Sequence, residues 1–267
     1  IILILLNSVL FGQSYSVIYE LKFKTDSLKD QYSSENMVLD ISEHETKFYY
    51  EKLLKFDSLS RKGINISFSM PLQQILKKAK GGKMYTNYYS VDGQYFQYNT
   101  LDEVKWEISE ENKIENNNQL QKAKTFFGGR SWEAWFSNET PLQEGPYKFK
   151  GLPGLIYEIR ESKNNFIYQL ISLTKLTDVS DTSNIVESCL GIKPITVTEK
   201  QFKKILLDKY LNPFSQFDNM NEGNFGFQYG DKYITTKKEL SDIKSSYQKN
   251  IRDHYNPIEL DKAIPYR

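Results

Sequence analysis

Alternation of apolar and polar side chains over residues 15–24 constrains the fold of this chain more than any other feature. Apolar residues fill every second position there, and of the residues between them only Ile18 is apolar. The inward set would be Tyr15, Val17, Tyr19, Leu21 and Phe23. Because successive side chains of a strand point to opposite faces, this pattern predicts a half-buried β-strand.

Short segments of similar character recur along the first half of the chain. They are NMVLDIS, ETKFYYEKL, KMYTNYYSV, GQYFQYN and EVKWEIS. Asp92 and Gly93 separate two of them, and this pair is typical of a two-residue hairpin turn. With 19 Tyr and 16 Phe, the composition also suits pleated, half-buried surfaces. We therefore expect a mainly β (α+β) fold, built on a curved antiparallel sheet or half-barrel rather than on βαβ units.

Helical patterns are fewer. We expect helical segments near residues 70–80, 199–211 and 237–252, packed on the sheet. The first has Pro71 in its first turn and two glycines at its end. The second begins with a capping box of Thr198 and Gln201, and Pro213 follows it. The Asn- and Glu-rich segment SEENKIENNNQLQKA is expected to be an exposed loop or a hairpin tip.

The first twelve residues, IILILLNSVLFG, are almost entirely apolar but too few to span a bilayer. They are typical of the apolar region of a signal peptide, with small residues at Gly12 and Ser14 for cleavage. We expect residues 1–14 to be a signal peptide truncated at its start, and residues 15–267 to be a single β-rich domain without a transmembrane span. A buried N-terminal strand is the alternative. The expected location is the periplasm, the outer membrane or the extracellular space.

Charge and chemistry-bearing residues narrow the function classes. The net charge of +1 gives no field that would attract nucleic acid. The two histidines, His44 and His254, and the one cysteine, Cys189, belong to no hydrolase or zinc motif. The sequence also contains no phosphate-loop motif. We therefore expect no cofactor and no metal. Adjacent carboxylates such as Asp102 and Glu103, or the pair 110 and 111, point to opposite faces of a strand and are interpreted as solvated charge.

The stretch GPYKFKGLPGLIYEI combines three glycines and two prolines before a predicted strand. Pro153 fixes its own φ, whereas Gly151 and Gly154 can adopt angles that side chains forbid. We interpret the stretch as a tight corner that starts a strand at Leu155, which pairs with the strand after the turn at residues 162–165. A ligand-contacting loop is the alternative.

At these residues the chain resembles the GLPGLI family of exported Gram-negative bacterial proteins. The signature consists of Gly151, Leu152, Pro153, Gly154, Leu155 and Ile156, and we treat it as a structural motif. Gly129 and Arg130, the WEAWFS segment and the near-terminal NPIEL also match. The resemblance implies a curved antiparallel sheet similar to the half-barrels of periplasmic lipoprotein carriers, and it implies no established activity.

Arg130 follows two glycines and precedes a Trp-rich strand, so its planar guanidinium could face a carboxylate or phosphate beside aromatic rings. The candidate ligand-binding residues are Arg130, Trp132, Trp135 and Tyr157. An ion pair between Arg130 and Glu158 or another sheet carboxylate is the structural alternative.

We expect a non-enzymatic exported binding or accessory protein of the cell envelope, which holds an apolar ligand such as a lipid, a peptide or a partner chain on its sheet. Two alternatives stay open: a hydrolase with a carboxylate-based site, and a structural subunit of an envelope complex. Converging carboxylates with perturbed pKa values would favour the hydrolase, and an exposed apolar patch would favour the subunit.

Overall fold

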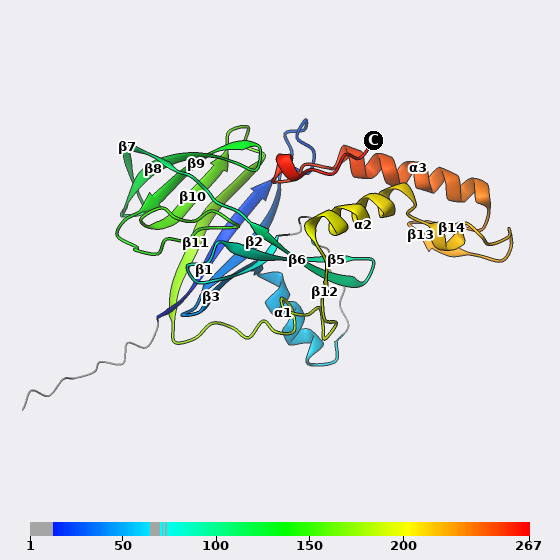
Figure 1. Cartoon of the computed structure of the whole chain (residues 1–267), viewed down its shortest axis with the longest axis horizontal. Coiled ribbons are helices and arrows are strands. Elements are labelled where there is room, and N and C mark those ends of the chain that lie inside the picture. The colour runs from blue at the N-terminus through cyan, green and yellow to red at the C-terminus, as the bar shows by residue number, and fades with distance from the viewer. Residues whose placement is uncertain (1–12, 65–69, 71, 73) are drawn as a thin grey trace, which may run out of the picture.

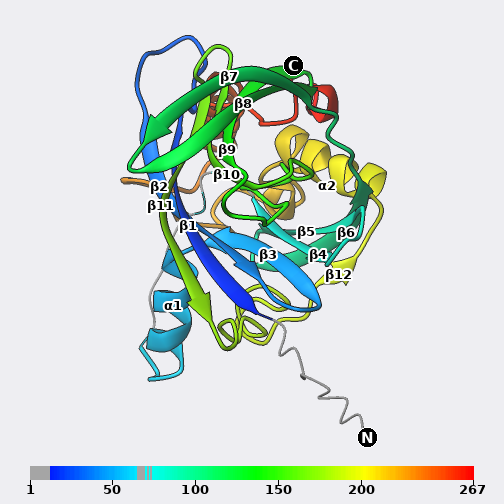
Figure 2. The ribbon, with the colours of Figure 1, turned by 90° about the vertical axis from the view of Figure 1, so that its left-hand side faces the viewer.

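The structure is a computed structural model that describes residues 13–64, 70, 72 and 74–267. Most of its strands join one open sheet in the order β12-β6-β5-β4-β3-β2-β1-β11-β10-β9-β8-β7, which curves around a core (Figures 1 and 2). The neighbours are antiparallel except for β12 and β6. The predicted mainly β fold with a curved antiparallel sheet is therefore confirmed. The strands are β1 (Ser14–Phe23), β2 (Ser33–Ile41), β3 (Glu45–Tyr50), β4 (Ile75–Ala79), β5 (Met84–Val91), β6 (Gln94–Leu101), β7 (Glu107–Glu115), β8 (Asn118–Phe127), β9 (Arg130–Ser137), β10 (Leu155–Glu161), β11 (Phe166–Leu176) and β12 (Ile195–Thr196).

β1 lies in the middle of the sheet and joins its two halves. Tyr15 pairs with Ile41 of β2 on one side and with Lys175 of β11 on the other. The alternating residues of β1 face the core, where Val17 and Tyr19 are fully buried. The predicted strand is therefore confirmed, and Ile18, the exception to its alternation, lies where the β1–β11 register shifts.

The Gly-Pro stretch forms the corner between β9 and β10. A Cβ on Gly154 would lie 1.8 Å from the backbone oxygen of Ser137, so no side chain fits at this position. Gly151 has a φ of +94°, in the region that favours glycine. The amide of Leu155 donates to the backbone oxygen of Thr140 at 2.9 Å, and β10 starts there.

Two of the three predicted helices are present. Both α2 (Glu199–Leu211) and α3 (Lys237–Asp253) begin at capping boxes, of Thr198 with Gln201 and of Thr236 with Glu239. The prediction of a helix near residues 70–80 is wrong, because residues 75–79 form β4 between β3 and β5. Hydrogen bonds to two neighbouring strands there outweigh the helical spacing of the apolar side chains. Residues 71 and 73 of this segment lie outside the described part of the chain.

One further segment differs from the expected structure, and the Asn-rich segment agrees with one of its two expected forms. The strand predicted to run through residue 53 ends at Tyr50, and α1 (Lys52–Ser60) follows it. The Asn-rich segment is a hairpin, with β7 and β8 joined by Asn116 and Asn117 at positive φ. Of the expected loop or hairpin tip, the second is correct. No helix in the described residues is long and apolar enough to cross a membrane.

A second, smaller apolar cluster lies apart from the sheet core, beneath α3. The cluster contains Phe225, Ile234, Leu240 and Ile243. Leu240 and Ile243 come from α3, and Ile234 comes from the short hairpin of β13 (Phe227–Tyr229) and β14 (Lys232–Ile234). Figure 1 shows this part extending away from the curved sheet. There are also two short 3₁₀ helices in the described residues. The first, η1 (Ser215–Phe217), precedes this hairpin, and the second, η2 (Leu260–Lys262), lies near the chain end.

Candidate binding cavity

A cavity of about 340 Å³ lies between the β5–β6 pair, α2 and residues 254–266, which we call the C-terminal segment. That volume is within the range of small-molecule sites. Aromatic and aliphatic side chains form most of its wall. They are Leu72, Tyr89, Val91, Tyr98, Tyr147, Phe202, Leu206, Tyr255, Pro257, Ile258, Ile264 and Tyr266.

Three rings from three elements, β5, β6 and α2, form one aromatic part of the wall. Phe202 of α2 lies 4.6 Å from Tyr89 and 5.2 Å from Tyr98, measured between ring centroids, and the two tyrosines stack at 5.6 Å. Burial raises the pKa of Tyr89 to about 12 and that of Tyr98 further, so both hydroxyls stay protonated at neutral pH. This part of the wall is therefore aromatic and uncharged at neutral pH.

Four charged side chains form a ring of ion pairs at the cavity, which we call the inner quartet: Asp102, Lys148, Glu259 and Lys262. Three of them line the cavity, and Asp102 contacts both lysines. Lys148 Nζ lies 2.7 Å from Asp102 Oδ2 and 2.6 Å from Glu259 Oε1. Lys262 Nζ lies 2.5 Å from Asp102 Oδ1 and also contacts Glu259 Oε2. The side chains of Lys148, Asp102 and Glu259 are at most 8% exposed. Two buried positive charges are thus matched by two negative charges.

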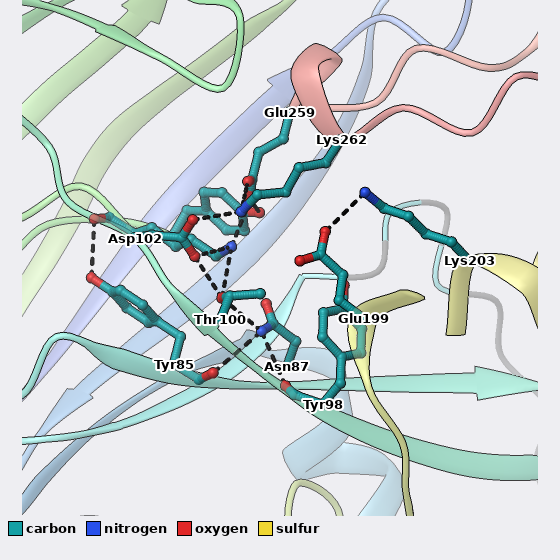
Figure 3. A network of polar contacts seen from close by, with 11 residues as sticks. Tyr85, Asn87, Tyr98, Thr100, Asp102, Glu199, Lys203, Glu259 and Lys262 are labelled. Atoms are coloured by element: carbon teal, nitrogen blue, oxygen red, sulfur yellow. Dashed lines mark hydrogen bonds and ion pairs between the residues drawn. The ribbon is translucent and has the colours of Figure 1, made fainter. Parts of the chain in front are cut away.

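Neighbouring polar groups complete the inner quartet (Figure 3). Thr100 donates to Asp102 Oδ2 at 2.5 Å and accepts from Asn87 at 3.0 Å. Tyr147 donates its hydroxyl to Glu259, from a backbone with a φ of +56°. A bulky residue rarely adopts that angle, so the surrounding contacts must hold it there.

The carboxylates of the inner quartet remain ionised. Burial alone would raise the pKa of Glu259, but Lys148 and Lys262 outweigh it and hold that pKa below its ordinary value. The pKa of Asp102 is likewise lowered, because the two lysines and Thr100 outweigh its desolvation. Neither group is therefore available as a proton donor near neutral pH.

Gln74 also lines the cavity, and its side chain is only partly satisfied. The residue is 2% exposed, and Tyr168 donates its hydroxyl to Gln74 Oε1 at 2.8 Å. Burial raises the pKa of Tyr168 well above its ordinary value, so this hydroxyl stays a donor. The nitrogen of the same amide, Gln74 Nε2, is buried and has no hydrogen-bond partner in the described structure.

Arg130, a candidate from the sequence, holds the C-terminal segment instead of facing the cavity. Its guanidinium donates to the oxygens of Asn256, Pro257 and Ile258 at 2.7, 2.7 and 3.1 Å. The carboxylate within ion-pair reach is Glu161 at 3.8 Å rather than Glu158. Arg130 is 5% exposed, so its contacts are with the chain itself.

The three aromatic candidates have separate sets of partners and do not meet at one site. Trp132 is 1% exposed and packs against Phe149 at 4.6 Å in the core. Trp135 lies between the ammonium groups of Lys113 and Lys122, at 4.7 and 5.5 Å. The hydroxyl of Tyr157 lies 3.2 Å from that of Thr140. None of the four candidates lines the cavity.

The interpretation of Asp102 as solvated charge is wrong, since it is 8% exposed and belongs to the inner quartet. His254 does line the cavity, and its Nδ1 lies 2.9 Å from the oxygen of Asn250. Burial raises the pKa of the Cys189 thiol. No group of three or more potential metal ligands occurs in the described part of the chain.

Sequence reasoning missed Lys148, Glu259, Lys262 and Gln74. Lys148 and Glu259 are 111 residues apart and meet through tertiary structure alone. One local signal was available: Lys148 interrupts the aromatic pair Tyr147 and Phe149 inside a stretch rich in glycine and proline. In the structure all three of these residues are buried.

A family model described as a protein of unknown function, Porph_ging, matches residues 77–158. The matched stretch holds β5 to β9 and the Gly-Pro corner, so this central part resembles an uncharacterised family. Two solved structures of PNGF-II, in the C2 and P21 space groups, have a TM-score of 0.53 and identities of 12% and 13%. They cover 74% of this chain, which spans 33% and 34% of theirs. At this identity the likeness shows the fold alone. No curated protein matches the chain.

Proposed function

We propose that this protein is a non-enzymatic binding protein that holds a small, largely apolar ligand in the cavity between β6, α2 and the C-terminal segment. The observation that carries the proposal is an aromatic cavity of about 340 Å³ at a place where three separate parts of the chain meet. An apolar ligand there would lose contact with water against Tyr98 and Phe202. Membership of the GLPGLI family is part of the proposal, supported by residues 151–156 within the matched region.

The charges around the cavity support binding over the hydrolase alternative. A carboxylate that acts as a general acid or base needs a pKa near the working pH and a free path to the substrate. Asp102 and Glu259 instead have lowered pKa values and contact Lys148 and Lys262. Their arrangement supports a role in fixing the wall of the cavity.

Native mass spectrometry of the protein purified from its own host tests the proposal, combined with extraction of small molecules. The Leu206→Trp variant adds an indole to the cavity wall, because Leu206 lines the cavity from α2. We expect the wild type to carry a small molecule that the variant has lost. An empty wild type, or equal loading of both proteins, would contradict the proposal.

Leu211→Trp is the matched control. Leu211 is the last residue of the same helix, is 45% exposed and does not line the cavity. A tryptophan there changes the helix surface by the same volume, so this variant should load like the wild type.

Export to the cell envelope is a further part of the proposal, supported by the apolar run of residues 1–12, and cell fractionation tests it.

A further inference from the structure

Each lysine and each glutamate that lines the cavity contacts an opposite charge. Lys148 and Lys262 are matched by Asp102 and Glu259 in the inner quartet. At the cavity wall on α2, Lys203 Nζ lies 2.9 Å from Glu199 Oε1, as Figure 3 also shows. A charged ligand would have to break one of these pairs or bury its own charge without a partner, and either costs free energy. The site therefore favours an uncharged molecule.

One donor in the cavity wall is left over after this pairing. Gln74 Nε2 is buried and has no partner among the described residues, whereas Tyr168 fixes the other end of the same amide. An unsatisfied buried donor costs about 1–3 kcal/mol, and water does not reach this atom to satisfy it. A ligand oxygen reaches this donor if the last side-chain torsion of Gln74, which is a soft one, turns Nε2 toward the cavity that the residue already lines. The same turn shifts Oε1 relative to the Tyr168 hydroxyl.

From these two features we propose that the ligand is an uncharged, mainly apolar molecule with a carbonyl or other neutral oxygen, which accepts a hydrogen bond from Gln74 Nε2. Gln74 is then the residue that sets specificity, and the rings of Tyr89, Tyr98 and Phe202 supply apolar contact. This inference rests on the proposed function. It adds the chemical class of the ligand and the position of its oxygen.

Three fragments of the same size test it: acetophenone, which has a carbonyl oxygen; α-methylstyrene, which has a methylene group in its place; and benzoate, which is charged. Their affinities are measured by NMR titration for the wild type and for Gln74→Met. We expect the variant to weaken acetophenone at least about fivefold more than α-methylstyrene, which corresponds to the loss of one hydrogen bond. For each fragment we take the ratio of its affinities for the variant and for the wild type. Comparing the ratio for acetophenone with that for α-methylstyrene cancels the different hydration of the two fragments.

Gln74→Leu is the second variant, because it removes the donor without placing an ionisable group at this buried position. It should show the same selective loss. Gln143→Met, at an exposed position outside the cavity, is the control and should change neither affinity. Thermal unfolding of each variant checks that it is folded.

The outcomes separate the two proposals. If acetophenone and α-methylstyrene bind in the cavity but respond equally to both Gln74 variants, the role of Gln74 is refuted and the proposed function stands. If benzoate binds the wild type more tightly than acetophenone, the preference for an uncharged ligand is refuted. If no fragment perturbs signals of the cavity residues, the proposed function fails together with this inference.

Discussion

Two rings, each of two lysines and two carboxylates, lie in different parts of the molecule, and they differ in burial. In the inner quartet, two lysines each contact two carboxylates, and three of the four side chains are at most 8% exposed. The second ring, the outer quartet, joins Lys47 and Lys77 to Glu45 and Glu187 at distances of 2.8–3.1 Å. Its side chains are 11–31% exposed. Water therefore screens the outer ring more than the inner one.

The two rings also fasten different kinds of segment. The outer quartet reaches a loop that is held as well by Ile185 and Val186, which are 4% and 0% exposed. The inner quartet holds the C-terminal segment, whose apolar anchors Ile258 and Ile264 keep 9% and 8% of their surface exposed. We therefore expect the C-terminal segment to depend on its ion pairs more than the loop does.

The largest expected effect comes from removing the central cation of the inner quartet. Lys148→Met leaves Asp102 and Glu259 buried with a single lysine between them, so it should lower the free energy of unfolding by about 3–5 kcal/mol. Lys77→Met makes the same change in the outer quartet and should cost at most about 1 kcal/mol. Urea unfolding of both variants measures the difference. Equal losses would refute the distinction between the rings.

The second largest expected effect is the loss of the stabilisation by Glu259 in acid. The pKa of Glu259 is lowered in the folded protein, so its contribution to stability is present above the ordinary glutamate pKa of about 4.3 and is lost as the pH falls through the lowered value. The stability gap between wild type and Glu259→Gln should therefore narrow below about pH 4. Glu187→Gln, whose parent pKa is also lowered, should show a smaller gap in the same window. A Glu259 gap that is constant with pH would contradict this assignment.

Salt should produce the smallest effect and should act on the outer quartet. At about 1 M salt the screening length falls to about 3 Å, which weakens exposed pairs and leaves buried ones nearly unchanged. The cost of Lys77→Met should then vanish, whereas that of Lys148→Met should persist. Unfolding of both variants at low and high salt tests this, and a strong salt response of Lys148→Met would show that water reaches the inner quartet.

Most of the sheet could be predicted because its signals are local. The Asp92–Gly93 turn has φ values of 51° and 76°, and it joins β5 to β6 as its residue types indicate. The capping box at Thr198 likewise identifies the start of α2. The prediction of a helix near residues 70–80 is wrong although Leu72, Ile75 and Leu76 have helical spacing. Residues 75 and 76 lie in a strand between two others that supply its hydrogen bonds.

The cavity could not be predicted, since its parts are distant in sequence. Residues from β6, α2 and the C-terminal segment meet there, and the partners of Asp102 are 46 and 160 positions away: Lys148 and Lys262. Arg130 was singled out correctly as unusual, but its partners are oxygens of the C-terminal segment 126 or more residues away. The sequence left open a ligand or a sheet carboxylate as its partner, and the structure supplies Glu161 of β10 together with these oxygens.

A crystal structure with bound 4-bromoacetophenone tests the central claim most directly, because anomalous scattering locates the bromine without ambiguity. The account predicts a bromine peak inside the cavity bounded by Tyr98, Phe202 and the C-terminal segment, with the fragment's oxygen beside Gln74. A cavity that holds only water at saturating fragment, or a bromine found solely on another surface, would contradict it.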